Sequence, residues 1–249
     1  MPRKKSRYPK KSYYGIQELI TIEAGLKNYS NDIVRKFAKG FGLNENKELN
    51  ITILDFGSGL GTLAEIWKIE FGITPVCIEV DPKLISNLRA KGFDTYLNLA
   101  QILDKQDIIY SSNVLEHIED DLGTLKALKN CVAPGGYLGL YVPALPFLFS
   151  DLDVSVGHFR RYKRKELIKK VEEAGFSVQA CFYNDCIGVL AALAIRIFGY
   201  KNNMKLGSMG SIIFYDKLIY PISRVLDKIV FRNLIGKNLF LFAINTAKP

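Results

Sequence analysis

Residues 53–61, which read ILDFGSGLG, constrain the fold of this chain more than any other stretch. The apolar, β-branched run Ile51–Phe56 is typical of a strand that is buried on both faces. Three glycines follow it with the spacing G-x-G-x-G, at Gly57, Gly59 and Gly61. Glycines between a first strand and a first helix let a ligand approach the backbone and the free N–H groups at the helix start. The stretch therefore predicts an α/β fold that binds a ligand at this loop, although a tight structural turn would use the same residues.

Downstream of this loop, strand and helix signals alternate along the chain. Helices are predicted over Thr62–Phe71, Pro82–Lys91, Asp121–Cys131 and Lys165–Gly175, and strands over Pro75–Val80, Thr95–Leu97, Asp107–Ser112, Tyr137–Val142 and Phe176–Phe182. This alternation favours a parallel sheet with helices on both faces. Residues 133–136, which read APGG, are expected to stop the helix before them. Upstream, Ile16–Tyr29 and Ser30–Gly42 are predicted as two helices, the second capped by Ser30 and the two residues after it.

The end of the chain breaks this alternation. A last strand is predicted over Lys237–Thr246, roughly fifty residues after Phe176–Phe182, whereas connections in compact domains usually have about 2–6 residues. The residues between them are rich in Ile, Leu, Phe and Tyr and predict an insertion with helices near 186–199 and 211–231. The chain thus divides into residues 1–49, a basic leader with N-terminal lid helices; 50–183, an α/β core; 184–236, a helical insertion or cap; and 237–249, the final strand of the core.

Composition and charge limit the setting in which the protein works. The 249 residues, 48% of them hydrophobic, suffice for one sizeable core. Six basic residues and no acids lie at positions 1–11, and such a tail is typical of phosphate or anionic-lipid contact, or of a disordered end. No signal peptide is recognisable, and the longest apolar run, Ile187–Ile195, is too short to span a bilayer. We expect a cytoplasmic protein with reduced thiols at Cys77, Cys131, Cys181 and Cys186.

Two acidic residues near the glycine loop narrow the choice of ligand. Asp55 stands two residues before Gly57, where a carboxylate is a poor neighbour for a pyrophosphate but suits an ammonium group. The spacing also differs from the G-x-G-x-x-G of dinucleotide-binding proteins. Glu79 ends the second predicted strand, where a carboxylate accepts hydrogen bonds from both hydroxyls of a ribose. These features fit an adenosine-like ligand with an amino-acid end and no phosphate, such as S-adenosylmethionine.

On these residues the chain resembles the class I S-adenosylmethionine-dependent methyltransferases. Four segments match the family's motifs in order: ILDFGSGLG (53–61), VCIEVDP (76–82), SSNVLEHI (111–118) and LKNCVAPGGYLGLYVP (128–143). The resemblance covers about residues 50–246 and implies a Rossmann-like, doubly wound sheet of seven strands, with an antiparallel last strand beside the Phe176 strand. It also implies that S-adenosylmethionine is bound and S-adenosylhomocysteine released.

The same resemblance assigns roles to individual residues around the methyl donor. Gly57, Ser58, Gly59 and Gly61 are expected at the methionine end, Glu79 at the ribose, Val80, Asn98 and Leu99 at the adenine, and Asn113 at the reactive centre. Asn98 departs from the family, in which an acid often stands at that position.

Two histidines are the candidates for the acceptor side, and both follow strands at the edge of the sheet where ligands bind. His117 ends the segment NVLEH, where it either holds a loop or acts on the acceptor. His158 lies in the segment VGHFRRY, which is similar to a Gly-His-x-Arg-Arg-Tyr segment of bacterial methyltransferases associated with glycan or lipid-linked sugar pathways. We expect His158 to be a base or an acceptor-positioning group, with Arg161 and Tyr162 orienting it or the acceptor.

Further residues between the last strands are open to two readings each. The basic run Arg160–Lys165 either grips an anionic substrate or is a solvated helix start. Asp151 and Asp153 are interpreted as an ordinary turn, and no metal site is predicted. The leader and the insertion are expected to form a lid, with tyrosines framing the site at Tyr13, Tyr14, Tyr141, Tyr215 and Tyr220. The apolar insertion suits an acceptor pocket, a homodimer face or a peripheral membrane contact.

Together these features predict an enzyme that methylates O or N of a small or medium-sized acceptor. A glycan-related, lipid-linked or peptide acceptor is favoured over nucleic acid, because no Asn/Asp-Pro-Pro-Tyr-type motif for a flipped base follows the fourth strand. Two alternatives remain: a nucleic-acid methyltransferase that uses the basic tail, and a non-catalytic S-adenosylmethionine-binding partner subunit.

Overall fold

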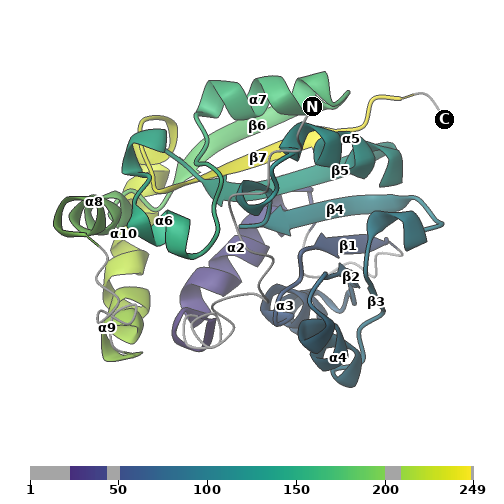
Figure 1. Cartoon of the computed structure of the whole chain (residues 1–249), viewed down its shortest axis with the longest axis horizontal. Helices are drawn as coiled ribbons and strands as arrows, with labels where there is room; N and C mark the ends of the chain where they lie inside the picture. Colours follow the sequence, from purple (N-terminus) through teal and green to yellow (C-terminus); the bar gives the residue numbers. More distant parts are fainter. Residues whose placement is uncertain (1–22, 44–50, 200–208, 248–249) are drawn as a thin grey trace, which may run out of the picture.

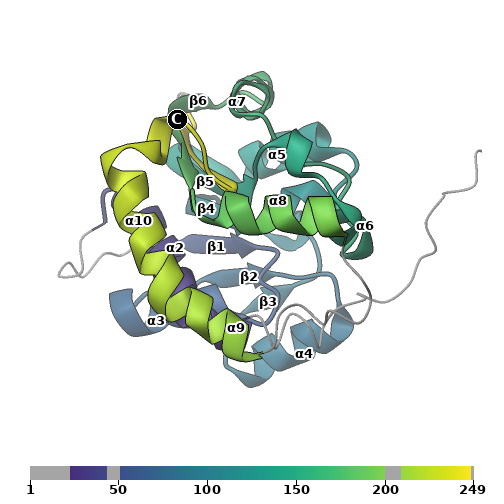
Figure 2. The same ribbon diagram turned by 90° about the vertical axis from the view of Figure 1, so that its left-hand side faces the viewer.

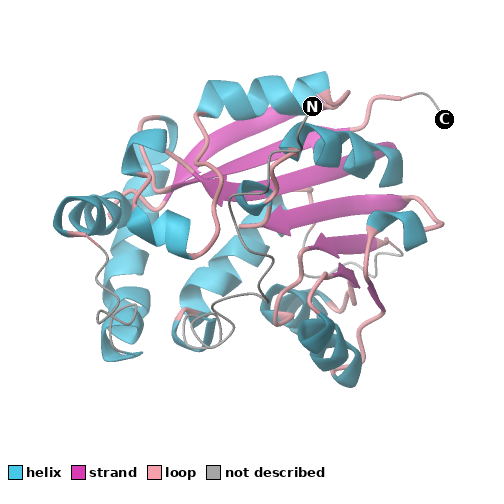
Figure 3. Ribbon diagram, viewed as in Figure 1, coloured by secondary structure: helices cyan, strands magenta, loops and turns pink. Residues whose placement is uncertain are grey.

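A computed structural model of the chain describes residues 23–43, 51–199 and 209–247. Within these ranges, one mixed sheet has helices on both of its faces (Figures 1 and 3). Its strands are β1 (Ile53–Phe56), β2 (Val76–Ile78), β3 (Thr95–Tyr96), β4 (Gln106–Ser112), β5 (Val132–Pro143), β6 (Ser177–Asn184) and β7 (Asn238–Ile244). The order is β3-β2-β1-β4-β5-β7-β6, and β7 runs antiparallel to both of its neighbours. This confirms the predicted seven-stranded sheet and the place of its last strand.

In the described part of the chain, helices lie on both faces of the sheet and at one of its edges (Figures 1 and 2). They are α2 (Lys27–Gly40), α3 (Thr62–Phe71), α4 (Pro82–Ala90), α5 (Asp121–Cys131), α6 (Asp151–Ser155), α7 (Arg164–Glu173), α8 (Gly188–Phe198), α9 (Met209–Phe214) and α10 (Tyr220–Ile229). Short turns η1 (Leu99–Gln101), η2 (Leu115–His117), η3 (Pro146–Leu148) and η5 (Phe231–Asn233) lie between them, and a wider helical turn η4 (Tyr215–Ile219) joins α9 to α10. None of the helices in the described part of the chain has the length and apolar character needed to cross a membrane.

The hydrophobic core consists of two main layers, one on each face of the sheet. Leucines of α5 and α7, such as Leu125 and Leu167, pack on one face. Aromatic residues of α2 and α3, such as Phe37 and Trp67, pack on the other. Gly139 of β5 makes the second layer tight, because a Cβ atom there would lie 2.5 Å from the Phe41 ring. The sheet is thus buried on both sides, as the apolar strand sequences predict.

The carboxyl ends of the parallel strands define the edge of the sheet on which the insertion lies. Strand β6 is antiparallel to β7 and therefore parallel to the rest of the sheet, so the insertion that follows it leaves from this edge. Figure 2 shows α8, α9 and α10 in front of this edge. The predicted insertion helices near 186–199 and 211–231 correspond to α8 and to the continuous run α9–η4–α10. The glycine loop, η2 and α6 reach the same edge.

Helix α2 starts earlier than the sequence predicts. It begins at Lys27, Ser30 lies inside it, and no side chain of its own caps it. Instead Asp216, in η4, accepts hydrogen bonds from the backbone N–H groups of Asn28 and Tyr29, both at 2.9 Å. The predicted Ser30 cap is wrong because a residue of the insertion satisfies these donors. The expected leader helix is described only from residue 23, so the basic tail and Tyr13-Tyr14 lie outside the described residues.

Two further local predictions are wrong. The helix before residues 133–136 ends at Cys131, as predicted, but the strand predicted over Tyr137–Val142 starts earlier, because β5 begins at Val132 and pairs with β4 across a register shift between Gln106 and Ile108. Asp151 and Asp153 do not form a simple turn but lie in the first turn of α6. Ser150 and Asp153 form a capping box at the start of that helix, which satisfies its first backbone donors.

The tyrosines expected to frame the site form a buried network instead. The hydroxyl groups of Tyr29 and Tyr141 are 2.5 Å apart, and Asn184 donates to Tyr141. Tyr220 donates to Asp32, and Tyr215 donates to Asp185. The described tyrosines of the prediction therefore fasten α2 and the insertion to β5 and β6, and Tyr141 and Tyr220 lie in the core.

Candidate active site

The glycine loop is a backbone cradle between β1 and α3. Its three glycines, Gly57, Gly59 and Gly61, have φ values of +82°, +55° and +83°. A Cβ atom on Gly57 would lie 2.3 Å from Cγ2 of Val114, so no larger residue fits there. The N–H groups of Gly57 and Ser58 donate to the carbonyl of Ile78, which fixes the loop to β2.

Glu79 joins the end of β2 to this loop. Its carboxylate is buried and accepts hydrogen bonds from the backbone N–H groups of Gly59, Val80 and Asp81, at 2.9, 2.7 and 3.0 Å. A carboxylate has about four lone-pair sites, so these three bonds leave capacity for a ligand hydroxyl. The side chain of Val80 beside it is 70% exposed, which provides apolar surface next to the carboxylate. A ribose on Glu79 with a flat base on Val80 fits this arrangement.

Three carboxylates gather around the loop and favour a cationic ligand. Asp55 is buried, and its burial, with Glu79 and Glu23 nearby, raises its pKa to about 7. Glu23 accepts a hydrogen bond from the hydroxyl of Thr62 at the start of α3. Like charges placed together in a low-dielectric region repel a phosphate and attract a cation. No sequence pattern indicates Glu23, because only the packing of the leader against α3 brings it to the loop.

Asn98 and Leu99 lie after β3 and have mainly local contacts. The side-chain oxygen of Asn98 accepts from the N–H of Ala100 at 3.1 Å, and Gln101 in turn accepts from the N–H of Asn98 at 3.3 Å. This reciprocal cap holds η1, and Leu99 packs against the core layer of α5 and α7. The side-chain oxygen of Asn98 therefore fixes the turn η1 that follows β3.

Asn113 follows β4 in a strained conformation next to the glycine loop. Its φ of +53° is in the left-handed region, which non-glycine residues adopt at a cost of about 1–3 kcal/mol, mostly at functional sites. Its N–H donates to the carbonyl of Tyr141 at 2.8 Å, and Asn238 donates to its side-chain oxygen at 3.4 Å. The next residue, Val114, packs on Gly57, so this turn places η2 directly beside the donor loop.

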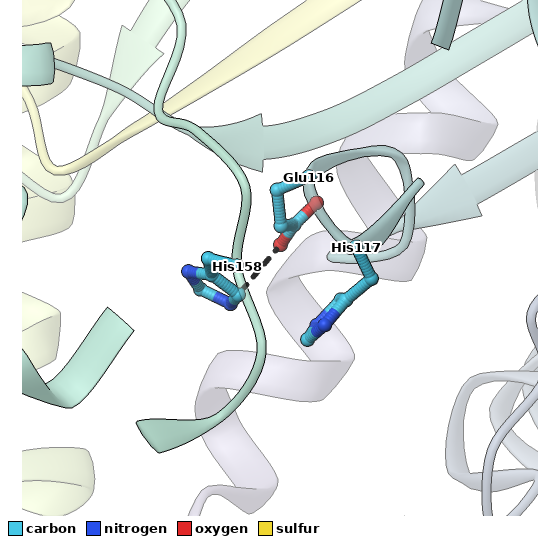
Figure 4. A group of neighbouring side chains, drawn as sticks. All are labelled: Glu116, His117 and His158. Atoms are coloured by element: carbon cyan, nitrogen blue, oxygen red, sulfur yellow. Dashed lines mark ion pairs between the residues drawn. The ribbon is translucent and has the colours of Figure 1, made fainter. Parts of the chain in front are cut away.

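The two predicted histidines meet beyond this turn, together with Glu116 (Figure 4). We call Glu116, His117 and His158 the His–Glu cluster. The histidine rings are 4.6 Å apart between centroids, and Nε2 of His158 lies 3.9 Å from Oε1 of Glu116. Glu116 is fully buried, and burial raises its pKa to about 8. Burial, with the neighbouring His158, lowers the pKa of His117 to about 4.

Asp153 fixes the orientation of His158. Its Oδ1 lies 2.8 Å from Nδ1 of His158 and also accepts from Nε of Arg161 at 2.8 Å. Burial alone would raise the pKa of Asp153, but the hydrogen bonds from His158 and Arg161 outweigh it and lower the pKa. An ionised Asp153 makes Nδ1 of His158 the protonated nitrogen, so the lone pair of Nε2 faces Glu116. Asp153, interpreted from the sequence as a turn residue, is thus the residue that aims His158.

The neighbours of His158 hold loops together and do not face open space. Arg161 is paired with Asp153, and Arg160 is paired with Asp121 at 2.7 Å. Tyr162 is fully buried and donates to Asp121 at 2.9 Å and to the carbonyl of Leu115 at 3.2 Å. Leu115 begins η2, so Tyr162 supports the turn that carries Glu116 and His117. The two arginines are likewise neutralised by carboxylates, which leaves only Lys163–Lys165 of the basic run for an anionic substrate.

Comparison with known proteins shows the family to which the chain belongs. A family model described as a methyltransferase domain matches residues 27–180, and the chain belongs to this family. It is an S-adenosylmethionine-dependent methyltransferase, and therefore an enzyme rather than a non-catalytic partner subunit. No curated protein matches the sequence.

Solved structures share the fold at low sequence identity. A methyltransferase from Archaeoglobus fulgidus has 17% identity and a TM-score of 0.59, over 92% of this chain and 98% of that one. A putative methyltransferase from Haloferax volcanii, in complex with the Trm112 activator, has 13% identity and a TM-score of 0.54, over 91% and 98%. Phosphoethanolamine N-methyltransferase 2 from Haemonchus contortus, with bound S-adenosyl-L-methionine, has 16% identity and a TM-score of 0.56, over 87% and 53%.

Proposed function

We propose that this methyltransferase transfers a methyl group to O or N of a small or medium-sized acceptor that lies at the His–Glu cluster. The observation that carries the proposal is the contact of Val114 with Gly57, which puts η2 and its two ligand-type side chains directly beside the donor loop. S-adenosylmethionine supplies the methyl group from its sulfonium, and the demethylated cofactor leaves as S-adenosylhomocysteine.

On the donor side, each residue has a contact or an exposure that supports its role. The bend made by Gly57, Gly59 and Gly61, with Ser58 between them, lets the methionine end lie against the backbone, and Asp55 and Glu23 place acidic groups near its ammonium. Glu79 receives the ribose hydroxyls, and Val80, Asn98 and Leu99 border the adenine. Asn113 stands between this site and the acceptor.

On the acceptor side, His158 or His117 prepares the nucleophilic atom. A lone pair of the acceptor forms the new bond to the methyl carbon while the carbon–sulfur bond breaks and sulfur keeps its electron pair. If the acceptor arrives protonated, Nε2 of His158 takes the proton, and Asp153 stabilises the charge that then develops on the ring. If it does not, the two rings hold the acceptor in line, and alignment of this kind is worth roughly 7–11 kcal/mol. Arg161 and Tyr162 act through Asp153 and η2 as positioning residues.

The acceptor class is tested by following the label. Full-length protein is incubated with tritium-labelled S-adenosylmethionine and an extract of its native cells, which is then separated into lipid, small-molecule, peptide and nucleic-acid fractions. We expect label in the lipid, small-molecule or peptide fraction, since the segment around His158 is similar to that of glycan-pathway methyltransferases. Label found only in nuclease-sensitive material would instead establish the nucleic-acid alternative and contradict this proposal.

One face of the insertion supports peripheral contact of a cytoplasmic protein with a lipid surface. The inner side of η4 and α10 is buried, with Asp216, Tyr220, Ser223 and Asp227 on it. The outer side exposes a stripe of large apolar residues three or four apart: Phe214, Leu218, Ile222, Val225 and Ile229. Lys217, Arg224 and Lys228 lie among them, so the stripe is apolar with a basic border. Such a helix binds anionic bilayers by combining apolar burial with charge attraction.

Membrane contact is tested by co-sedimentation with phosphatidylcholine vesicles that contain phosphatidylglycerol. We expect the protein to bind and salt to weaken the binding, because surface charges are screened. The double substitution Leu218→Glu and Ile222→Glu should abolish binding. Ile69→Glu should leave binding unchanged, because Ile69 is an exposed apolar residue of α3 outside the stripe. If the native protein is a dimer that the double substitution dissociates, without vesicle binding, the stripe is a homodimer face instead.

A further inference from the structure

We propose that the His–Glu cluster binds one divalent transition-metal cation, with an open coordination position toward the acceptor. The inference deepens the proposed function and rests on it only for the place of the acceptor. The cation itself is inferred from Glu116, His117 and His158, which come from η2 and from the loop after α6 (Figure 4).

The first observation is the state of Glu116. Its side chain is fully buried, and neither carboxylate oxygen has a hydrogen-bond partner among the residues that the structure describes. A buried carboxylate without a partner is costly, and proteins normally pair such groups or use them to coordinate metals. Its Oε1 lies 3.9 Å from Nε2 of His158, which is longer than a hydrogen bond. A cation between the three side chains supplies the missing partner.

The second observation is the spacing of the donor atoms. One ligand atom from each of Glu116, His117 and His158 can be chosen so that all lie within 4.8 Å of one another. Ligands at about 2.1 Å from one zinc ion stand about 3.4 Å apart in a tetrahedron. The 3.9 Å between His158 and Glu116 is about 0.5 Å longer than this, and the limit of 4.8 Å for the set means that the side chains must close by at most about 1.4 Å around an ion.

The third observation is the support behind the ligands. Histidine ligands usually donate their second ring N–H to a carboxylate or a carbonyl, which fixes the tautomer. His158 has this partner in Asp153, at 2.8 Å, and His117 has a hydrogen bond with the backbone of Gly157. The N–H of Phe159 donates to the carbonyl of Glu116 at 2.8 Å, which ties the two loops together. The His158 ring is thus held with Nε2 on the side of the cluster.

The donor types indicate the class of ion and what it does. Two imidazoles with one carboxylate suit zinc and its neighbours in the first transition row better than magnesium or calcium, which prefer oxygen ligands. Three protein ligands leave a position for one more oxygen, as in catalytic zinc sites. An acceptor hydroxyl in that position is held in place and loses its proton to water more readily, so with the ion bound His158 is a ligand and not the base. The proposed acceptor is accordingly an alcohol or a phenol.

The test measures metal binding without reference to activity. Full-length protein is freed of metal by chelation and titrated with Co²⁺, whose visible absorption reports the coordination of the ion, and Zn²⁺ is then added in competition. We expect one Co²⁺ per chain, displaced by Zn²⁺. Glu116→Gln and His158→Ala should each abolish stoichiometric binding, and Asp153→Asn should weaken it about 10–100-fold.

Asp151→Asn is the matched control, because Asp151 is an exposed acid of the same helix as Asp153 and lies outside the cluster. Binding that survives both Glu116→Gln and His158→Ala, or absence of binding in the native protein, overturns the proposal. His158→Ala changes a partly exposed side chain, so it keeps the test decisive if Glu116→Gln does not fold. Calorimetry with S-adenosylhomocysteine on the same samples separates the metal site from the proposed function. Protein that binds S-adenosylhomocysteine but no metal refutes only the metal site.

Discussion

Replacing His158 by alanine is expected to lower turnover by about 10²–10⁴-fold, the usual contribution of a positioned acid–base group. The affinity for S-adenosylmethionine should stay the same, because His158 contacts Asp153 and Glu116 rather than the donor loop. The rate is measured as formation of S-adenosylhomocysteine, with the extract fraction that becomes labelled as the acceptor. Calorimetry measures the affinity for S-adenosylmethionine.

Two controls separate this role from a structural one. Lys169→Ala changes an exposed residue of α7 outside the basic run and should leave the rate unchanged. Asp153→Asn keeps the shape of the side chain but removes the charge that orients His158, so it should lower kcat more than it raises KM. If His158→Ala keeps a normal melting temperature and methylates the labelled acceptor at the native rate, the acceptor-site assignment is refuted.

The second large effect is expected for Glu79→Ala, which should weaken S-adenosylmethionine binding by at least about 100-fold, or about 2.7 kcal/mol. A hydrogen bond to a charged group is worth roughly 1.5–3 kcal/mol, and Glu79 is proposed to bind two ribose hydroxyls. The substitution also removes the partner of the Gly59 N–H, so the cradle loses a bond that shapes it.

Calorimetry with S-adenosylmethionine and with S-adenosylhomocysteine measures this loss. Asp104→Ala is the matched control, because it removes one exposed negative charge just before β4, at the amino edge of the sheet. If Glu79→Ala and the native protein bind S-adenosylmethionine with equal affinity, Glu79 does not bind the ribose, and the proposed placement of the donor loses its main support. Thermal unfolding of both variants shows whether the fold is retained.

The core elements near the glycine loop were predictable because their signals are local. The β-branched run before Gly57 and the glycines with positive φ specify a strand, a turn and a helix without help from distant residues. The α5 bounds agree for the same reason, since Asp120 at its start caps it from the adjacent position. The start of α2 was not predictable, because its cap, Asp216, lies 188 residues further along the chain.

Each half of the acceptor site was recognisable in the sequence, but its composition was not. His117 and His158 stand out as the two histidines of the chain, each after a strand that ends at the binding edge. Glu116 looked like part of a motif, and Asp153 looked like a turn residue. Only the packing of η2 against the loop after α6 leaves one carboxylate buried without a partner and sets the other behind a histidine ring.

The sequence by itself determined the sheet, its order of elements and the identity of the methyl donor. These properties depend on residues close together in the chain, on hydrophobic periodicity and on glycines that only one backbone conformation accepts. The tertiary structure decided which acidic residues lie around the glycine loop, that Tyr141 and Tyr220 are buried and that Glu116 meets the two histidines. Such meetings depend on contacts between residues far apart in the chain, and no local pattern encodes the distance between two loops that fold against each other.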